Sequence, residues 1–289
     1  MSELTGWQRI AHRAFILLIA AAVLLPLYWL LLTSITPQIH LAGTPHPVMV
    51  PTEPTLDAYA RLLNPEATAG SRFSPAASFR RSLLNSTIVA AVSTLLAMIL
   101  GTLAAYSMSR LKPPAGPLWF ALILGSYMIA PITLAIPLFS VFRMLGVLDT
   151  YIPLIVMYTA FGVGWATLIM RNYFALLPFE LEEAARIDGC SRLGALVRII
   201  LPVAAPGLVS VGIVTFLLCW GEFLFALLFT NSNAARTMPI VVTMFVGEFG
   251  VEYNMIAAAL VLGIIPPVVV ALVFQRYIVA GLTSGAMKG

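Results

Sequence analysis

Long apolar stretches alternate with polar segments along the whole chain. An α-helix of ~20 residues crosses the hydrocarbon core of a bilayer, so each stretch has about the length of one transmembrane span. The pattern therefore predicts an all-α, polytopic membrane protein with six transmembrane helices. The expected spans are residues 14–33, 82–108, 117–142, 153–170, 207–229 and 255–275.

The polar segments predict the orientation of these spans. Lys and Arg are frequent before the first span and in residues 109–116 and 173–205, and loops with such an excess face the cytoplasm. Residues 36–80, which are rich in proline and should contain a short helix near Leu56–Leu63, then form an external loop. A second external loop is expected at residues 231–254, and both termini are expected in the cytoplasm.

This orientation gives the expected division of the chain. Residues 1–13 form a cytoplasmic N-terminus, residues 14–280 the transmembrane domain, and residues 281–289 a cytoplasmic tail. Small residues recur through the second span, which should allow another helix to approach it closely. They are Ala90, Ala91, Ser93, Ala97, Gly101, Ala104 and Ala105.

Composition agrees with a membrane protein. The chain of 289 residues is 60% hydrophobic and 10% charged, whereas soluble domains carry about 25% charged residues. The net charge of +4 is therefore interpreted through the positions of Lys and Arg in loops, with no nucleic-acid partner expected. Cys190 and Cys219 imply no disulfide framework, and the three His form no cluster with metal-ligand spacing.

The charged stretch from Pro178 to Pro206, within the loop 173–205, has its own helical pattern. Pro178 suits a first helical turn, and three Glu follow it there, where acids favour the positive end of a helix. Gly189 suits a left-handed helix stop, and Ser191 can cap a second helix, which Pro202 should end. We call Pro178–Pro206 the bracket: a helix, a glycine turn and a second helix.

The bracket resembles the EAA signature of the permease subunits of ABC importers. The matching positions are Glu183, Ala184, Ala185, Gly189, Ile199, Leu201 and Pro202, and Asp188 fits the carbohydrate branch of that family. Cys190 stands where relatives usually carry Ala. The tail QRYIVAGLTSGAMKG resembles the C-terminus of the maltose-type second permease.

The resemblance implies a function and a set of partners. The chain would be the permease of an ATP-driven carbohydrate importer in a prokaryotic plasma membrane, working with a second permease, two ATP-binding subunits and an external solute-binding protein. ATP and Mg would belong to the ATP-binding subunits, with no cofactor and no catalytic residue in this chain, which contains no GxxxxGK[ST] phosphate loop.

The resemblance also implies roles for individual residues. Glu183 would bond to the ATPase, Ala184 and Ala185 would allow close docking, and Gly189 would set the angle between the two helices of the bracket. The last residues of the tail, Gly285, Lys288 and Gly289, would also approach the ATPases.

Two stretches are candidates for the translocation path. In MIAPITLAIPL, Pro131 breaks the third span, and Met128 and Pro131 either line a pore or mark a packing kink. In CWGEFLFALLFT, Glu222 and Phe223 resemble part of a Trp-Asn-Glu-Phe-Leu pattern of the family, with Gly221 in place of Asn. Glu222 is either a polar residue of the path, or of the interface with the partner permease, or a structural acid bonded to a neighbouring helix.

Other functions are weighed against this one. An ion-coupled secondary transporter also uses broken helices, but it usually has an internal repeat, and we find none between residues 14–142 and 153–276. A membrane-embedded enzyme would need several ionisable groups at one depth, whereas Glu222 is the one clear case inside a span. A permease for a glycerol-phosphate-type solute is the alternative within the family.

Overall fold

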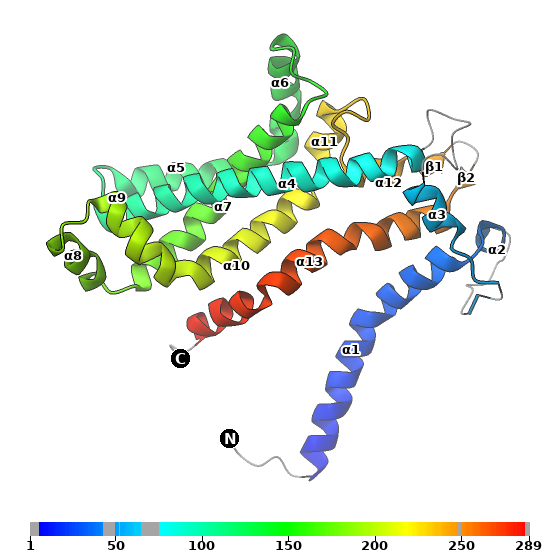
Figure 1. Cartoon of the computed structure of the whole chain (residues 1–289), viewed down its shortest axis with the longest axis horizontal. Helices are drawn as coiled ribbons and strands as arrows, with labels where there is room; N and C mark the ends of the chain where they lie inside the picture. The colour runs from blue at the N-terminus through cyan, green and yellow to red at the C-terminus, as the bar shows by residue number, and fades with distance from the viewer. Residues whose placement is uncertain (1–5, 43–49, 52, 65–74, 248–249, 287–289) are drawn as a thin grey trace. The chain divides into compact units, whose positions relative to one another are not determined.

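The computed structural model describes the chain except residues 1–5, 43–49, 52, 65–74, 248–249 and 287–289. The described part is almost entirely helical, with one short antiparallel hairpin in which Val246 pairs with Val251 (Figure 1). The elements in order are α1 (Gly6–Ile35), α2 (Gln38–Ala42), α3 (Asp57–Leu63), α4 (Pro75–Tyr106), η2 (Ser107–Leu111), α5 (Gly116–Met128), α6 (Pro131–Met144), α7 (Tyr151–Leu176), α8 (Glu180–Ile187), α9 (Arg192–Ala195), η3 (Leu196–Ile200), α10 (Leu201–Trp220), α11 (Leu224–Phe229), α12 (Met238–Thr243), β1 (Val246–Gly247), β2 (Gly250–Val251) and α13 (Tyr253–Ala286).

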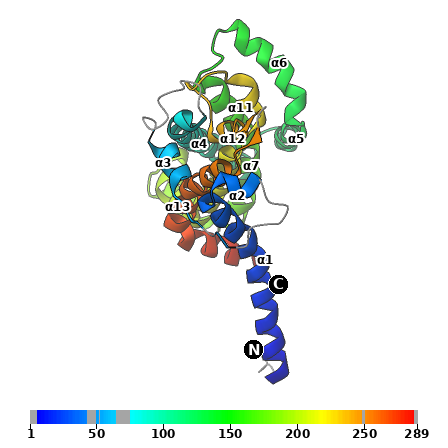
Figure 2. The same ribbon diagram turned by 90° about the vertical axis from the view of Figure 1, so that its right-hand side faces the viewer.

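Membrane-spanning segments agree with the six predicted spans. Five helical segments of the described residues are long and apolar enough to cross a membrane, and the pair α5–α6 makes a sixth if it counts as one span. That pair is bent by 89° at Ile129–Ala130, directly before Pro131 (Figure 2). The ring of Pro131 disfavours helical backbone at the residue before it, which explains why the helix stops there.

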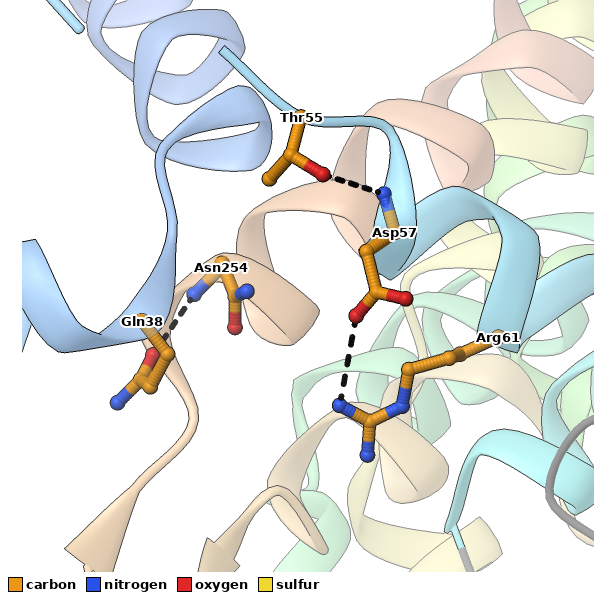
Figure 3. Close-up of polar contacts among 5 residues, drawn as sticks. All are labelled: Gln38, Thr55, Asp57, Arg61 and Asn254. Carbon is orange, nitrogen blue, oxygen red and sulfur yellow. Dashed lines mark hydrogen bonds and ion pairs between the residues drawn. The ribbon is translucent and has the colours of Figure 1, made fainter. Parts of the chain in front are cut away.

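Two compact units make up the chain. The first contains residues 1–80 and 241–264, and the second contains residues 81–240 and 265–289. In the first unit, Gln38 after α1 accepts a hydrogen bond from the backbone N–H of Asn254 at 3.4 Å (Figure 3). Thr55 accepts one from the N–H of Asp57, and Asp57 forms a 3.9 Å ion pair with Arg61, so both stabilise the short helix α3.

Close helix contact dominates the second unit, as the small residues of the second span predicted. A Cβ atom on Gly101 of α4 would lie 2.6 Å from the Cβ of Ala166 in α7. A Cβ on Gly162 of α7 would likewise lie 2.8 Å from that of Ala97. Both glycines therefore let the backbones of α4 and α7 approach more closely than any larger residue would permit.

Two predicted boundaries in this unit are wrong. Pro202 does not end a helix, because the π-helical turn η3 precedes it and the helix continues through α10. Proline lacks an N–H and crowds the preceding turn, and a π turn widens the helix at that place. The predicted span 207–229 is also interrupted, since α10 ends at Trp220 and α11 begins only at Leu224.

Candidate functional site

The first helix of the bracket, α8, ends in a complete glycine stop. Gly189 has a φ of +86°, which a residue with a side chain adopts only with strain. Its N–H donates to the carbonyl of Arg186 at 3.1 Å, and the N–H of Cys190 donates to that of Ala185 at 3.0 Å. These two bonds are the Schellman motif, and they confirm the role predicted for Gly189 as the helix stop. Pro178 lies one residue before the N-cap Phe179, just ahead of the first turn.

The second helix of the bracket begins as predicted at Ser191. The Ser191 hydroxyl accepts a hydrogen bond from the backbone N–H of Gly194 at 3.1 Å and so caps α9. The helical segment then runs without interruption from Arg192 to Trp220. The bracket therefore consists of a short separate helix, α8, and the first turns of the continuous helical segment that runs to Trp220.

The inner side of α8 is attached to the end of α4 by a buried hydrogen bond. The Tyr106 hydroxyl donates to a carboxylate oxygen of Glu182 at 2.7 Å, and only 5% of each side chain is exposed. The same hydroxyl lies 3.3 Å from the carbonyl oxygen of Arg192, at the start of α9. One tyrosine thus contacts both helices of the bracket.

Arg110 attaches η2 to the end of α7. Its guanidinium donates to the carbonyl oxygens of Phe174 at 2.7 Å and of Leu177 at 2.8 Å, where α7 leads into the bracket. It also lies 4.9 Å from the centre of the Phe179 ring. The sequence suggested Arg110 only as a marker of the cytoplasmic side. No signal in the sequence indicated that Arg110 contacts the end of α7, because the two segments are 64 and 67 residues apart.

The signature residues divide between the two sides of the bracket. Ala185 is 5% exposed and packs inward, whereas Glu183 and Ala184 face outward. Ile187 beside them is 85% exposed, and Asp188 and Gly189 are exposed as well. On the second helix, Pro202 is exposed, whereas Ile199 and Leu201 are partly buried.

An apolar surface accompanies the exposed signature residues. Leu193 is 61% exposed and Val197 is 53% exposed, and both belong to the second helix of the bracket. Together with Glu183, Ala184 and Ile187 they make up what we call the outer face of the bracket. Figure 1 shows α8 and α9 together at one end of the helices α4, α7 and α10. An exposed surface that combines apolar side chains with a carboxylate is typical of a docking site.

The second candidate site is the break between α10 and α11. Both carboxylate oxygens of Glu222 accept backbone hydrogen bonds, from Phe225 at 3.0 Å and from Ala226 at 3.3 Å. Glu222 thereby satisfies N–H groups at the start of α11 that have no partner within the helix. This geometry favours the structural interpretation of Glu222, which caps its own segment.

A cavity of about 310 Å³ lies beside this break. The hydroxyl of Tyr158, a buried side chain, has no hydrogen bond of normal geometry among the described residues. Of the four candidate path residues, Pro131 and Glu222 line the cavity. Met128 and Phe223 do not line it; Met128 is 84% exposed and Phe223 is 39% exposed. The lining residues are Tyr127, Pro131, Tyr158, Phe161, Gly162, Thr215, Leu218, Cys219, Glu222 and Phe225.

The remaining predicted residues are in the C-terminal tail. Gly285 lies near the end of α13, which runs to Ala286, so the helix extends further than the predicted span 255–275. Lys288 and Gly289 lie outside the described residues. Among the residues that the structure describes, no group of three or more His, Cys, Asp or Glu could hold a metal ion.

Comparisons with known proteins agree on one family. Residues 93–284 match the model of the family described as binding-protein-dependent transport system inner membrane component. The chain is 37% identical over 276 residues to the sulfoquinovosyl glycerol transport system permease protein SmoH of Agrobacterium fabrum, covering 94% of this chain and 93% of that protein. It is 38% identical over 274 residues to the trehalose/maltose transport system permease protein MalG of Thermococcus litoralis, covering 94% of each.

The fold has a counterpart among solved structures. A chain of a bacterial ABC transporter involved in the import of the acidic polysaccharide alginate superposes with a TM-score of 0.74. The two chains share 21% sequence identity, and the match covers 96% of this chain and 98% of the other. The all-helical membrane architecture predicted from the sequence is thereby confirmed.

Proposed function

The chain belongs to the family of binding-protein-dependent transport system inner membrane components, and on that basis we propose that it is the permease subunit of an ATP-driven importer for a carbohydrate. The observation that carries the proposal is the outer face of the bracket, where Glu183 and Ala184 lie exposed beside Ile187. Relatives of nearly the same length support it, since their names specify sulfoquinovosyl glycerol in one case and trehalose and maltose in another.

We further propose that the outer face docks onto an ATP-binding partner. Glu183 would accept hydrogen bonds there, Ala184 would let the partner approach closely, and Ile187 would bury its exposed side chain. The importer would contain a second permease, two ATP-binding subunits that hold ATP and Mg, and an external solute-binding protein. Both termini would lie on the cytoplasmic side with the loop 173–205.

Movement of the ATP-binding subunits would reach the transmembrane helices through the contacts of the bracket. The bond of Glu182 joins the bracket to the end of α4, and the bonds of Arg110 join η2 to the end of α7, which leads into the bracket. The second helix of the bracket continues into α10. Displacement of the outer face would therefore move these helices together. The cavity beside Glu222, with its aromatic walls, would form part of the carbohydrate path that opens alternately to each side.

The test is a charge reversal at Glu183. The Glu183→Lys variant should reduce uptake of the carbohydrate by at least about tenfold, because a like charge opposes a partner surface shaped for a carboxylate. The ATP-binding subunits should no longer copurify with the variant in mild detergent. The melting temperature of the purified chain should not change, since Glu183 is exposed.

Glu180→Lys is the matched control, because Glu180 is also exposed in the first turn of α8 but lies outside the signature. It should leave both uptake and copurification near the wild-type level. Normal uptake by the Glu183→Lys variant would contradict the docking role. Recovery of the wild-type chain without any ATP-binding subunit would contradict the importer itself.

A further inference from the structure

The cavity beside Glu222, here called the Glu222 cavity, has walls that indicate which solutes it can admit. All of its lining residues belong to the second unit, and they come from α5, α6, α7, α10, α11 and the break between the last two. Its volume of about 310 Å³ is at the lower end of the range for small-molecule pockets. The space therefore suits a small solute such as a single sugar ring.

Glu222 gives this cavity a negative charge. None of the other lining residues is Lys, Arg, His or Asp, and Glu222 forms no ion pair with a cation of the described residues. The carboxylate is also fixed in place, because its oxygens accept backbone N–H groups from Phe225 at 3.0 Å and from Ala226 at 3.3 Å. A second negative charge in the cavity would be repelled at short range, with no cation among the lining residues to offset the repulsion.

Aromatic rings form a large part of the wall. The ring centres of Phe161 in α7 and Phe225 in α11 are 5.8 Å apart, and their planes differ by 33°. Both residues line the cavity, together with Tyr127 and Tyr158. The face of an aromatic ring is the negative side of its quadrupole, so it attracts the weakly positive C–H groups of a sugar ring and repels an anion. The rings and the carboxylate therefore favour the same class of solute.

The accessible part of the wall also disfavours anions. Tyr127 is 39% exposed and Leu218 is 52% exposed, whereas Cys219 and Phe225 are buried. A solute that enters exchanges water for these apolar and aromatic side chains. An anion loses far more hydration energy in that exchange than a neutral hydroxyl group does, unless a cation or several donors replace the water. The lining residues supply no such cation.

We propose that the Glu222 cavity selects uncharged sugars and rejects solutes that carry a sulfonate, phosphate or carboxylate. The inference rests on the proposed function and adds a selectivity to it. Glu222 acts through its charge while its oxygens stay bonded to the start of α11, so it needs no contact with the solute. The glycerol-phosphate-type alternative would place a phosphate beside this carboxylate and is disfavoured for that reason.

Saturation-transfer difference NMR with the purified full-length chain tests the selectivity. The detergent must lack a sugar headgroup, which would compete for the cavity. The probes are the methyl glycosides of glucose, galactose and mannose, each compared with its 6-sulfonate counterpart at the same ionic strength. At least one neutral glycoside should bind, and its sulfonate should bind at least about tenfold more weakly, because the added charge meets Glu222 where apolar walls exclude water.

Glu222→Gln tests the cause of this preference. It keeps the shape of the side chain but removes the charge, and it should reduce the preference for the neutral glycoside about fivefold. A purely structural effect would weaken both probes alike and leave their ratio unchanged. Phe161→Leu should weaken the neutral glycoside about threefold, since it removes an aromatic face from the wall. Glu180→Gln, at an exposed position of α8, is the matched control and should leave the ratio within about twofold of wild type.

Four outcomes would overturn the inference: equal binding of the neutral and sulfonated glycosides, an unchanged ratio in the Glu222→Gln variant, unaltered binding by the Phe161→Leu variant, or no glycoside binding at all. Copurification of ATP-binding subunits reports on the importer separately. A wild-type chain that retains these subunits but shows no preference contradicts the selectivity alone. A chain that prefers the neutral glycoside but recovers no ATP-binding subunit contradicts the proposed function alone.

Discussion

The bracket and the break at Glu222 each contain an acidic residue beside a helix end, yet the two regions are held in different ways. Glu182 in the bracket is bonded to Tyr106 of another helix, and Arg110 of η2 is bonded to the end of α7, directly before the bracket. Glu222 instead accepts hydrogen bonds from its own segment, three and four residues ahead. The bracket should therefore move as one body with its neighbours, whereas the break is a local cap beside a cavity.

The largest effect is expected for Arg110→Met. The substitution leaves the carbonyl oxygens of Phe174 and Leu177 without their buried donor and should destabilise the protein by about 3 kcal/mol. Thermal unfolding in detergent measures the loss. Arg81→Met, at an exposed position of α4, should change stability by less than about 0.5 kcal/mol. Equal losses in both variants would show that Arg110 does not attach the bracket.

A smaller effect is expected for Tyr106→Phe. Loss of the hydroxyl that donates to Glu182 should cost about 1.5 kcal/mol, since the acceptor is a buried carboxylate. A double-mutant cycle with Glu182→Met, which has a similar shape but no oxygen acceptor, should give a coupling energy of about 1 kcal/mol or more. Tyr253→Phe, at a side chain that is 48% exposed, is the control. Strict additivity in the cycle would contradict a bond between the two helices.

Replacing Glu222, between α10 and α11, should reduce stability less than either substitution above. Glu222→Ala removes a cap from α11 and should lower stability by about 1 kcal/mol, while Glu222→Gln retains one acceptor and should lower it less. Carbohydrate uptake should remain within about threefold of wild type in both variants, because each variant changes only one local helix cap. Uptake that falls further while stability is unchanged would instead assign Glu222 to contact with the solute.

The smallest loss of stability is expected at Asp149, which precedes α7 and is bonded to residues 231 and 232. These bonds are partly exposed to solvent. Asp149 accepts hydrogen bonds from the Ser232 hydroxyl and from the backbone N–H groups of Asn231 and Ser232. Burial alone would raise the pKa of Asp149, but these bonds and the charge of Arg236 hold it below the ordinary value of 3.8. The aspartate therefore contributes stability above pH 3.8, and that contribution disappears as the pH falls through the lowered pKa.

Asp149→Asn should accordingly reduce the free energy of unfolding at pH 7 by less than about 1 kcal/mol, because solvent screens the partly exposed group. Unfolding measured between neutral pH and pH 3 should show the variant and wild-type curves converging toward the acid end. A difference that grows on acidification would contradict the sign of the shift.

Local signals in the sequence predicted much of this architecture. The apolar stretches indicated the spans, and Gly189 and Ser191 marked the helix stop and the cap of the bracket, because each acts on its nearest neighbours. The continuation of the helix through Pro202 was missed, since a π turn before a proline has no distinct residue pattern. The interruption at Gly221–Phe223 was missed as well, because apolar residues on both sides conceal the end of α10.

The attachments of the bracket could not be predicted from the sequence. Tyr106 and Glu182 are 76 residues apart, and their hydrogen bond depends on how α4 and α8 are packed. The signature indicated which residues matter but not which side each faces. The outward position of Glu183 and the inward position of Ala185 follow from the rotation of α8 about its axis.

The unbroken segment from Arg192 to Trp220 also acts as a lever. Its 29 residues extend over about 44 Å at the rise of an α-helix, from the outer face of the bracket to the edge of the Glu222 cavity. A tilt of only about 5° at the Arg192 end would displace the Trp220 end by about 4 Å. A small tilt at the outer face would therefore become a displacement of several ångströms beside the Glu222 cavity.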